Sequence, residues 1–171
     1  MSAVAVFDVL TELYGLQPDI KWANDVHVNG KKISGILAEM KETDLGLAIV
    51  VGIGINLKSA NSPPDVKDSA TSIEEETAGN PNVENLLESL TEKLSFYYEL
   101  LKETDGAAQI RREWARRSSY CEGKSVSVKL LNETFHGTTR GIEENGALRV
   151  ETVTGEIKIV QAGDVERLRK I

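Results

Sequence analysis

An apolar run interrupted by three glycines, Leu45 to Leu57, constrains the fold more than any other segment of this 171-residue chain. Most of its 13 residues are Val, Ile or Leu, which is typical of a β-strand buried on both faces. The run is too short for a membrane span, which needs about 20 apolar residues. We therefore expect no membrane segment, and a sheet whose neighbouring layers cover this strand.

The surroundings of this strand look incomplete in the sequence. Its glycines, Gly46, Gly52 and Gly54, allow another group to approach the backbone closely. A strand buried on both faces also needs neighbours on both edges and a layer over each face. Helices predicted within residues 70–117 supply one layer, but residues 1–60 offer little to cover the other face. The layout indicates the second half of a larger sheet domain.

Periodicity and turn signals predict the elements on either side of the strand. Apolar residues at helical spacing indicate helices, and Asn29-Gly30 predicts a tight hairpin between two extended segments. Two consecutive prolines mark a loop. The expected elements are a helix at 3–14, extended chain at 20–28, a returning strand at 32–40, a loop at 58–68, and helices at 70–78, 82–103 and 105–117.

From Gly123 onward the apolar period changes from helical to alternating. Four or five short strands separated by turn signals are typical of a small barrel of the SH3 type. We place a domain boundary near Tyr120 to Gly123, which gives domains at 1–120 and 121–171. The expected fold class is α/β (α+β), a mixed and largely antiparallel sheet with helices, followed by a small SH3-like β-barrel.

The charge distribution argues against nucleic acid as a partner. The net charge is −7, and the centre of the chain is the most acidic part, whereas nucleic-acid binders normally present a basic face. Four arginines on one predicted helix form the candidate basic patch. A solvated helix face explains them, and contact with a phosphate or an acidic partner is the alternative. These residues are Arg111, Arg112, Arg116 and Arg117.

The remaining isolated residues favour structural roles. Cys121 is the one cysteine, which excludes an internal disulfide and a cysteine-rich metal site. His27 and His136 lie far apart in the sequence, so we expect no metal at either. Trp114 is expected to anchor the two domains against each other. The sequence has no basic-then-apolar leader, so we expect a cytoplasmic protein.

One short run, Lys21-Trp22-Ala23-Asn24-Asp25-Val26, combines a cation, an amide and a carboxylate. Lys32 lies across the predicted hairpin, so Lys21, Asp25 and Lys32 are expected to converge. Two lysines near a carboxylate suit phosphate transfer, because the cations neutralise phosphoryl oxygens and the carboxylate holds Mg²⁺. The plain alternative is a Lys/Asp pair on the surface of a hairpin. The glycines of GIGIN (52–56) lack the spacing of a dinucleotide-binding loop.

Several runs occur together in a fixed order: KWANDVHVNGKKISGIL (21–37), VGIGINL (51–57), ATSI (70–73), GTTRGIEENGALRVET (137–152) and GDVERL (163–168). This ordered set resembles the biotin protein ligase family over essentially the whole chain. The resemblance implies part of a class II synthetase-like catalytic domain and a C-terminal SH3-like domain. It also implies a two-step reaction that uses ATP, biotin and Mg²⁺. The biotin carboxylate attacks the α-phosphate of ATP to form biotinyl-adenylate, and a lysine of an acceptor domain then takes the acyl group.

The resemblance also implies a role for each matching residue. Lys32 would contact the carboxyl and phosphate of bound biotin or its adenylate, and Lys21 and Asp25 would complete the catalytic set, with Asp25 holding Mg²⁺. Residues 58–68 match a loop that closes over the adenylate. The expected biotin-binding residues are Lys32, Gly35, Leu37, Gly52, Ile53 and Ile55. The expected ATP-binding residues are Lys21, Asn24, Asp25 and Asn56.

Two departures from the family pattern matter. Ala23 stands at a position that is usually proline, which relaxes the turn slightly. The family's loop that organises biotin and ATP is Gly-Arg-rich, yet no Gly-Arg-Gly occurs in this chain. We therefore expect half of a catalytic site, inactive alone and completed by a second chain that supplies the front half. The alternatives are a C-terminal fragment and a non-catalytic scaffold that keeps the ligase fold.

The expected partners are a biotin acceptor (biotin carboxyl carrier) protein and either that second chain or another copy of this one. Exposed sheet edges drive such pairing. Met1 at the start of a predicted helix favours a natural split over a truncation. The sequence leaves open the identity of the acceptor, the oligomeric state, and whether lipoate replaces biotin. It contains no helix-turn-helix segment, so we expect no repressor function.

Overall fold

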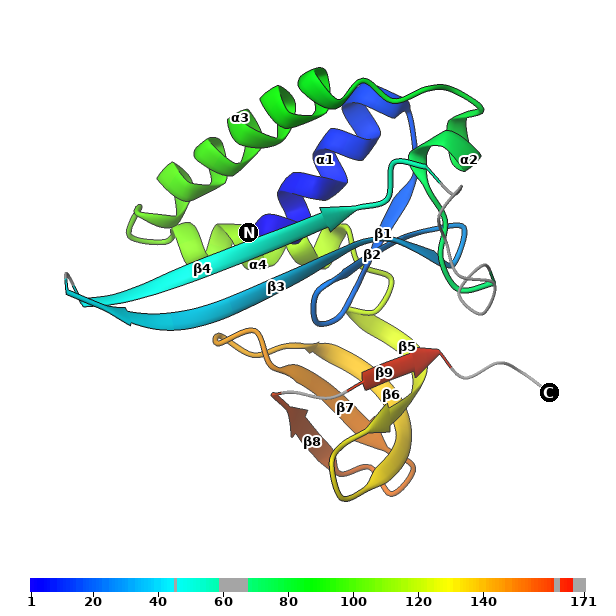
Figure 1. Cartoon of the computed structure of the whole chain (residues 1–171). Helices are drawn as coiled ribbons and strands as arrows, with labels where there is room; N and C mark the ends of the chain where they lie inside the picture. The colour runs from blue at the N-terminus through cyan, green and yellow to red at the C-terminus, as the bar shows by residue number, and fades with distance from the viewer. Residues whose placement is uncertain (45, 59–67, 162–163, 168–171) are drawn as a thin grey trace.

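The computed structural model describes residues 1–44, 46–58, 68–161 and 164–167, which form two antiparallel sheets with helices beside the first (Figure 1). The first sheet has the strand order β1-β2-β3-β4 and the second has the order β8-β7-β6-β5-β9. The α+β class is confirmed. Every strand pair in the described ranges is antiparallel, so the expectation of a mixed sheet survives only as one isolated parallel bridge.

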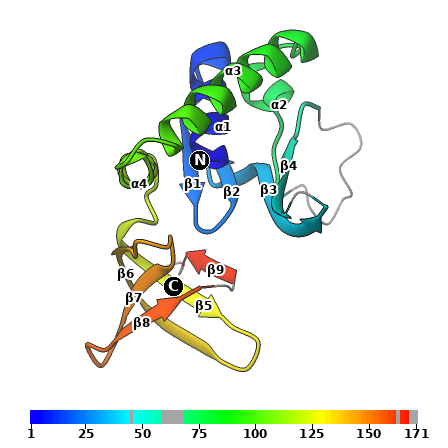
Figure 2. The same ribbon diagram turned by 90° about the vertical axis from the view of Figure 1, so that its left-hand side faces the viewer.

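The helices form in all four predicted places. Helix α1 and helix α3 lie side by side over the first sheet, and α4 leads toward the second sheet (Figures 1 and 2). No helix in the described part of the chain is both long and apolar enough to cross a membrane. The helix bounds are α1 (Ser2–Tyr14), α2 (Ile73–Thr77), α3 (Val83–Leu101) and α4 (Gly106–Arg116).

Local sequence explains where these helices begin and end. Helix α1 ends because Gly15 adopts a left-handed φ of 64°, and its N–H bonds the Thr11 carbonyl at 3.0 Å. Helix α3 begins at Asn82, whose side chain accepts a hydrogen bond from the Asn85 N–H at 2.8 Å. The buried face of α1 then packs on the sheet. Its members are Val4, Ala5, Val6, Val9 and Leu10.

The segment 20–28 differs from the sequence expectation. It is a hairpin of two strands, because the chain reverses at Trp22, Ala23 and Asn24 before running back antiparallel. The reversal occurs where Trp22 turns into the buried core. The Asn29-Gly30 hairpin is confirmed, and both residues have the positive φ that this turn requires, 52° and 80°. The strands are β1 (Pro18–Lys21), β2 (Asp25–Val28), β3 (Lys31–Thr43) and β4 (Gly46–Ile55).

The expectation of a strand buried on both faces at 45–57 is wrong. Leu45 lies outside the described residues, and β4 is largely exposed along the rest of its length. Its side chains at Leu47 and Ile49 are 74% and 73% exposed. The outer halves of β3 and β4 extend as a two-stranded arm beyond the helices (Figure 1). The apolar composition correctly predicts a strand, but no described element covers its outer half.

The predicted four or five short C-terminal strands are confirmed, since five occur in the described residues. Strands β8 and β9 stand at opposite edges of the sheet and do not pair with each other in the described ranges, so closure into an SH3-like barrel stays a prediction. The strands are β5 (Glu122–Lys129), β6 (Thr134–Ile142), β7 (Leu148–Thr152), β8 (Ile157–Val160) and β9 (Asp164–Arg167).

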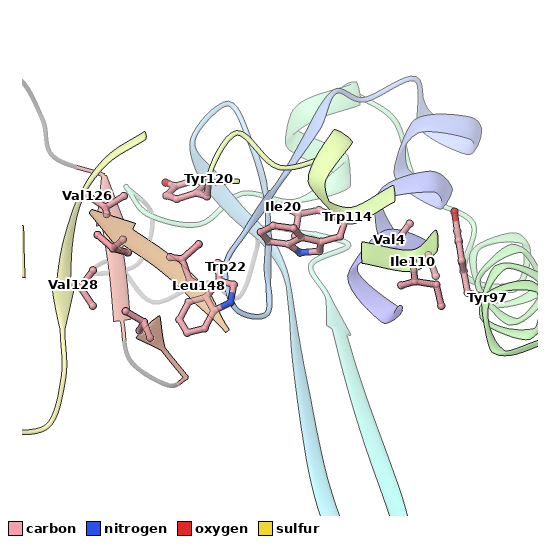
Figure 3. Close-up of a cluster of buried hydrophobic side chains, with 13 residues drawn as sticks. Val4, Ile20, Trp22, Tyr97, Ile110, Trp114, Tyr120, Val126, Val128 and Leu148 are labelled. Carbon is pink, nitrogen blue, oxygen red and sulfur yellow. The ribbon is translucent and has the colours of Figure 1, made fainter. Parts of the chain in front are cut away.

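One buried cluster joins the two sheets (Figure 3). Trp114 of α4 belongs to it, as its predicted anchoring role requires. The second sheet begins at β5, within the range proposed for the boundary, but the division of the chain into two domains remains a prediction. The labelled members of the cluster are Val4, Ile20, Trp22, Tyr97, Ile110, Trp114, Tyr120, Val126, Val128 and Leu148.

Candidate active site

The hairpin between β2 and β3 brings two of the predicted catalytic side chains together. The Lys32 ammonium lies 2.6 Å from the Asp25 carboxylate oxygen Oδ1, so the two groups form a hydrogen-bonded ion pair. In the strand register, Asp25 pairs with Lys21 on one side and with Gly35 on the other. Residues paired in this way project from the same face of a sheet. All three predicted catalytic residues therefore lie close together, and Lys32 reaches Asp25 directly.

Gly35 makes room for this ion pair. A Cβ atom at this position would lie 2.9 Å from Lys32 Cε, 3.0 Å from Lys32 Nζ and 3.6 Å from Asp25 Oδ1. The first two distances are shorter than ordinary van der Waals contacts, so any side chain here would push the lysine aside. Glycine at position 35 thus serves the geometry of Lys32 and Asp25, which the sequence pattern did not reveal.

The ion pair changes the electrostatics of the carboxylate. Burial by itself raises the pKa of the Asp25 carboxyl, but His27 and Lys32 stabilise its charged form and hold the pKa below its ordinary value. The His27 ring nitrogen Nε2 lies 4.0 Å from Asp25 Oδ2, which is too long for a hydrogen bond. That nitrogen is buried and has no hydrogen-bond partner among the described residues. His27 therefore lies beside the carboxylate, and the sequence analysis assigned it no role.

Asn24 fastens the β1–β2 turn to β3. Its side-chain amide donates to the Ile36 carbonyl at 2.7 Å, and its own carbonyl accepts from the Ile36 N–H at 2.9 Å. These two bonds hold the turn beside the middle of β3. Asn24 was predicted to bind ATP, and the structure places it next to Asp25 with its amide nitrogen engaged by the protein.

An open hollow of about 480 Å³ lies against this turn, over β3 and β4. Four of the predicted biotin-binding residues besides Lys32 line it, together with Asn24. Ile55 does not line the hollow, since it packs against the buried cluster beneath the sheet. The lining residues are Asn24, Lys32, Gly35, Ile36, Leu37, Gly52, Ile53 and Gly54. The glycines leave backbone exposed along one wall, which suits a flat ligand.

Asn56 acts on the backbone rather than on the hollow. Its side-chain amide donates to the Thr71 carbonyl at 2.9 Å and to the Lys32 carbonyl at 3.3 Å. The Lys32 N–H and carbonyl are further bound to Ser69 and Thr71. Asn56 therefore helps to fix the segment that follows residue 67 against the backbone of Lys32. Sequence reasoning placed Asn56 beside the nucleotide and missed Thr71, although ATSI had marked this segment.

The remaining predicted features fall into three groups. All four arginines contact the protein, three of them on α4 and Arg117 directly after it. Arg117, for example, binds Asp8 at 2.9 Å and also binds Glu113, so the solvated-face interpretation is incomplete. In the described ranges no group of three or more His, Cys, Asp or Glu side chains could hold a metal ion. Most of the predicted closing loop at 58–68 lies outside the described residues.

The geometry of the fold matches that of solved biotin protein ligases. The apo structure of the biotin protein ligase from Aquifex aeolicus has a TM-score of 0.84 and 27% identity, over 98% of this chain and 73% of that one. A biotin protein ligase from Aquifex aeolicus in complex with biotin and ATP has a TM-score of 0.83 and 27% identity, over 99% and 69%. The fold is thus that of the biotin protein ligases, and one of these solved ligases holds biotin and ATP.

Sequence comparisons identify the family. The model of the Biotin/lipoate A/B protein ligase family matches residues 1–56, and that of the Biotin protein ligase C terminal domain matches residues 123–168. The chain is 32% identical to the biotin--[acetyl-CoA-carboxylase] ligase of Paracoccus denitrificans over 171 residues, which cover 96% of the chain and 70% of that relative. The chain belongs to the biotin protein ligase family, as its motifs predicted.

The chain also matches a longer relative. It is 34% identical over 175 residues to the bifunctional ligase/repressor BirA of Bacillus subtilis, covering 97% of this chain and 51% of that protein. The chain therefore spans about half the length of this relative.

Proposed function

We propose that this chain contributes the biotin- and ATP-binding face of a biotin protein ligase. Biotin would enter the hollow over β3 and β4, and its carboxylate would attack the α-phosphate of ATP. Pyrophosphate leaves and biotinyl-adenylate forms. The amine of an acceptor lysine then attacks the acyl carbon, and AMP leaves. Family membership and the fold shared with a ligase bound to biotin and ATP support this proposal.

The observation that carries the proposal is the placement of Lys32. Its ammonium lies at the edge of the hollow, 2.6 Å from Asp25, where a carboxyl group inside the hollow and a phosphate beside the β1–β2 turn would meet. A fixed cation at that point stabilises the negative charge that develops on the phosphate. Asp25 keeps the ammonium oriented before substrate arrives. Lys21, on the same face, would complete the positive charge around the phosphates.

The walls of the hollow fit the predicted biotin residues. Gly52 and Gly54 expose the backbone of β4, while Leu37 supplies apolar surface for the ring system. Ile53 also borders the hollow, but its side chain packs against the buried cluster beneath the sheet. Ile55 would support this wall from behind, through the buried cluster. Asn24 would lie beside ATP, and Asn56 would act indirectly by holding the Lys32 backbone.

Mg²⁺ would depend mainly on the phosphates of ATP. The Oδ1 oxygen of Asp25 already binds Lys32, so this residue would contribute at most one free oxygen. Mg²⁺ is commonly held by one or two carboxylates together with substrate phosphates. A single carboxylate is compatible with that arrangement, and the described residues contain no cluster of three or more His, Cys, Asp or Glu side chains that would hold the ion without the phosphates.

We also propose that a separate chain segment completes the site. The arm of β3 and β4 exposes large apolar side chains on both of its faces, and proteins normally cover such side chains. A front half with a Gly-Arg-rich loop would cover this arm and grip the other side of the substrates. A biotin carboxyl carrier domain would deliver the acceptor lysine. The exposed side chains are Leu37, Met40, Leu47, Ile49 and Val50.

The first experiment measures ATP- and biotin-dependent labelling of an acceptor domain, with the chain alone and with a candidate front half. We expect labelling only in the mixture. Lys32→Ala should lower adenylate formation by about 100-fold or more, because it removes the cation at the reacting phosphate, while leaving assembly of the mixture unchanged. Lys102→Ala is the control, since that lysine pairs with Glu99 on the exposed end of α3.

Two outcomes would contradict the proposal. Full labelling by the purified chain alone would refute the need for a front half, and unchanged adenylation by Lys32→Ala would refute the assigned site. A non-catalytic scaffold that keeps the ligase fold is the second candidate. The one observation that favours it is the set of exposed apolar side chains on the arm, which would bind a partner without catalysis. It predicts that neither biotin nor ATP binds in any mixture. Replacing biotin with lipoate in the same assay tests the alternative acyl group.

A further inference from the structure

Trp22 connects the turn at the candidate active site to the second sheet. It belongs to the run that carries Asn24 and Asp25, but its indole is buried in the cluster between the sheets (Figure 3). The indole Nε1–H donates a hydrogen bond of 2.9 Å to the Gly146 carbonyl, 124 residues away. A buried indole that donates to a distant backbone carbonyl fixes both its own position and that of its acceptor.

The acceptor belongs to a well-defined turn between β6 and β7. Gly146 has a left-handed φ of 85°, and Asn145 closes the turn by accepting a hydrogen bond from the Ala147 N–H at 3.0 Å. Helix α4 holds the same turn, because Arg111 donates to the Glu144 carbonyl at 2.9 Å. These hydrogen bonds hold the Gly146 carbonyl in a defined position relative to the second sheet.

On the other side of Trp22, the chain leads directly to the reacting groups. Asn24 follows Trp22 by two residues and is bound twice to Ile36 of β3. Asp25 comes next and binds Lys32 at 2.6 Å. The β1–β2 turn is thus held at its far end by β3 and at its near end by the indole.

The strand before Trp22 is held by other contacts. Ile20 donates from its N–H to the Arg117 carbonyl at 3.0 Å, and its own carbonyl accepts from the Ser118 hydroxyl at 2.6 Å. These bonds fix β1 against the segment that follows α4. They do not reach the turn itself, whereas the indole hydrogen bond of Trp22 links the turn directly to the second sheet.

We propose that Trp22 is a positioning residue, through which the β6–β7 turn sets the place of Asn24 and Asp25 at the active site. The inference rests on the proposed function, because it assigns the second sheet a part in the same reaction. Loosening the indole bond lets the β1–β2 turn move, which separates Asn24 from Ile36 and shifts Asp25 relative to Lys32. The second sheet then acts on catalysis without touching substrate.

Trp22→Phe tests the inference, since it keeps an aromatic ring in the cluster and removes the N–H donor. The readout is hydrogen–deuterium exchange of the Ile36 N–H, measured by NMR and divided by the exchange rate of the Ile20 N–H. We expect this ratio to rise about tenfold, because the Ile36 bond reports the turn and the Ile20 bond does not. Trp114→Phe is the matched control, since Trp114 lies in the same cluster on α4, and should leave the ratio unchanged.

A second variant reaches the turn from the opposite side. Asn145→Ala removes the acceptor that closes the β6–β7 turn and should raise the same ratio about threefold. This variant decides the question if Trp22→Phe does not fold. In the mixture with a front half, Trp22→Phe should lower kcat for adenylation and leave KM for biotin unchanged.

An unchanged ratio in both variants, or an equal rise at Ile36 and Ile20, overturns the inference and leaves a purely structural role for the indole. The exchange experiment needs no substrate, so its failure is distinct from failure of the proposed function. If the unmutated chain forms no adenylate with any front half, the proposed function fails, while the exchange ratio still decides whether Trp22 positions the turn.

Discussion

Gly35→Ala separates the geometry of the candidate site from the stability of the fold. The added Cβ would stand 2.9 Å from Lys32 Cε and 3.0 Å from Lys32 Nζ, so the end of the lysine must move by about 0.5–1 Å to reach ordinary contact. The ammonium lies 2.6 Å from Asp25 Oδ1, and a displacement of this size away from the carboxylate lengthens the contact to about 3.1–3.6 Å, at or beyond the limit of a good hydrogen bond.

The free energy of unfolding should change little. The Lys32 side chain is 45% exposed, so the loss of its ion pair costs at most about 1 kcal/mol after screening by solvent. Replacing glycine by alanine within a strand gains about 0.5–1 kcal/mol from the unfolded chain. The two effects nearly cancel, and the melting temperature should shift by no more than about 3 °C. Adenylation should nevertheless fall about tenfold or more, because the cation no longer stands at the phosphate.

The assay compares thermal unfolding of the chain with adenylate formation in the mixture with a front half. Gly52→Ala is the control for the geometry of Lys32 alone, because a Cβ there would meet only the Leu37 carbonyl at 3.9 Å and leaves Lys32 in place. Gly52 also lines the hollow, so this control is read from the Asp25 pKa and not from adenylation. NMR titration should show a higher pKa for Asp25 in Gly35→Ala and no change in Gly52→Ala. Full adenylation by Gly35→Ala, or an unmoved Asp25 pKa, would refute the reasoning.

Three further expectations follow from other contacts. The pKa of Asp25 is lowered in the folded chain, so its contribution to stability is present above the ordinary pKa of about 3.9 and is lost as the pH falls through the folded pKa. Asp25→Asn should therefore reduce the change in the urea unfolding midpoint between about pH 5 and pH 2. Arg117→Ala leaves the Asp8 carboxylate, only 12% exposed, without its cation and should cost about 2–3 kcal/mol by urea denaturation, whereas Arg116→Ala at a 73% exposed site should cost less than about 0.5 kcal/mol. Val50→Lys on the exposed arm should leave stability within about 0.5 kcal/mol but weaken association with a front half or a second copy in sedimentation; unchanged association would remove the arm from any interface.

Local signals predicted most of the elements, because each depends on a few neighbouring residues. Gly15 ends α1 and Asn29-Gly30 forms the hairpin turn, because these residue types readily adopt the positive φ that both features require. The reversal at Trp22 was not predicted in this way, and the side chain there is held by a contact with the second sheet, 124 residues away. The exposure of β4 was also missed, because composition shows how apolar a strand is but not which faces its neighbours reach.

For the candidate site too, the sequence predicted some features and missed others. The motifs predicted that Asp25 and Lys32 would meet, and the hairpin register brings this about. The sequence did not reveal that a side chain at position 35 would displace the end of Lys32, nor that Asn56 binds the Lys32 backbone. Both facts depend on distances across strands that spacing along one chain does not fix.

The buried cluster between the two sheets has a consequence for cooperativity. Side chains from both halves meet in this cluster, where Val126 and Leu148 of the second sheet join Ile20 of β1 and Trp114 of α4. Loss of structure on either side would expose part of these apolar side chains to water. We therefore expect the two sheets to unfold together, and a ligand that stabilises the first sheet would then raise the unfolding midpoint of both.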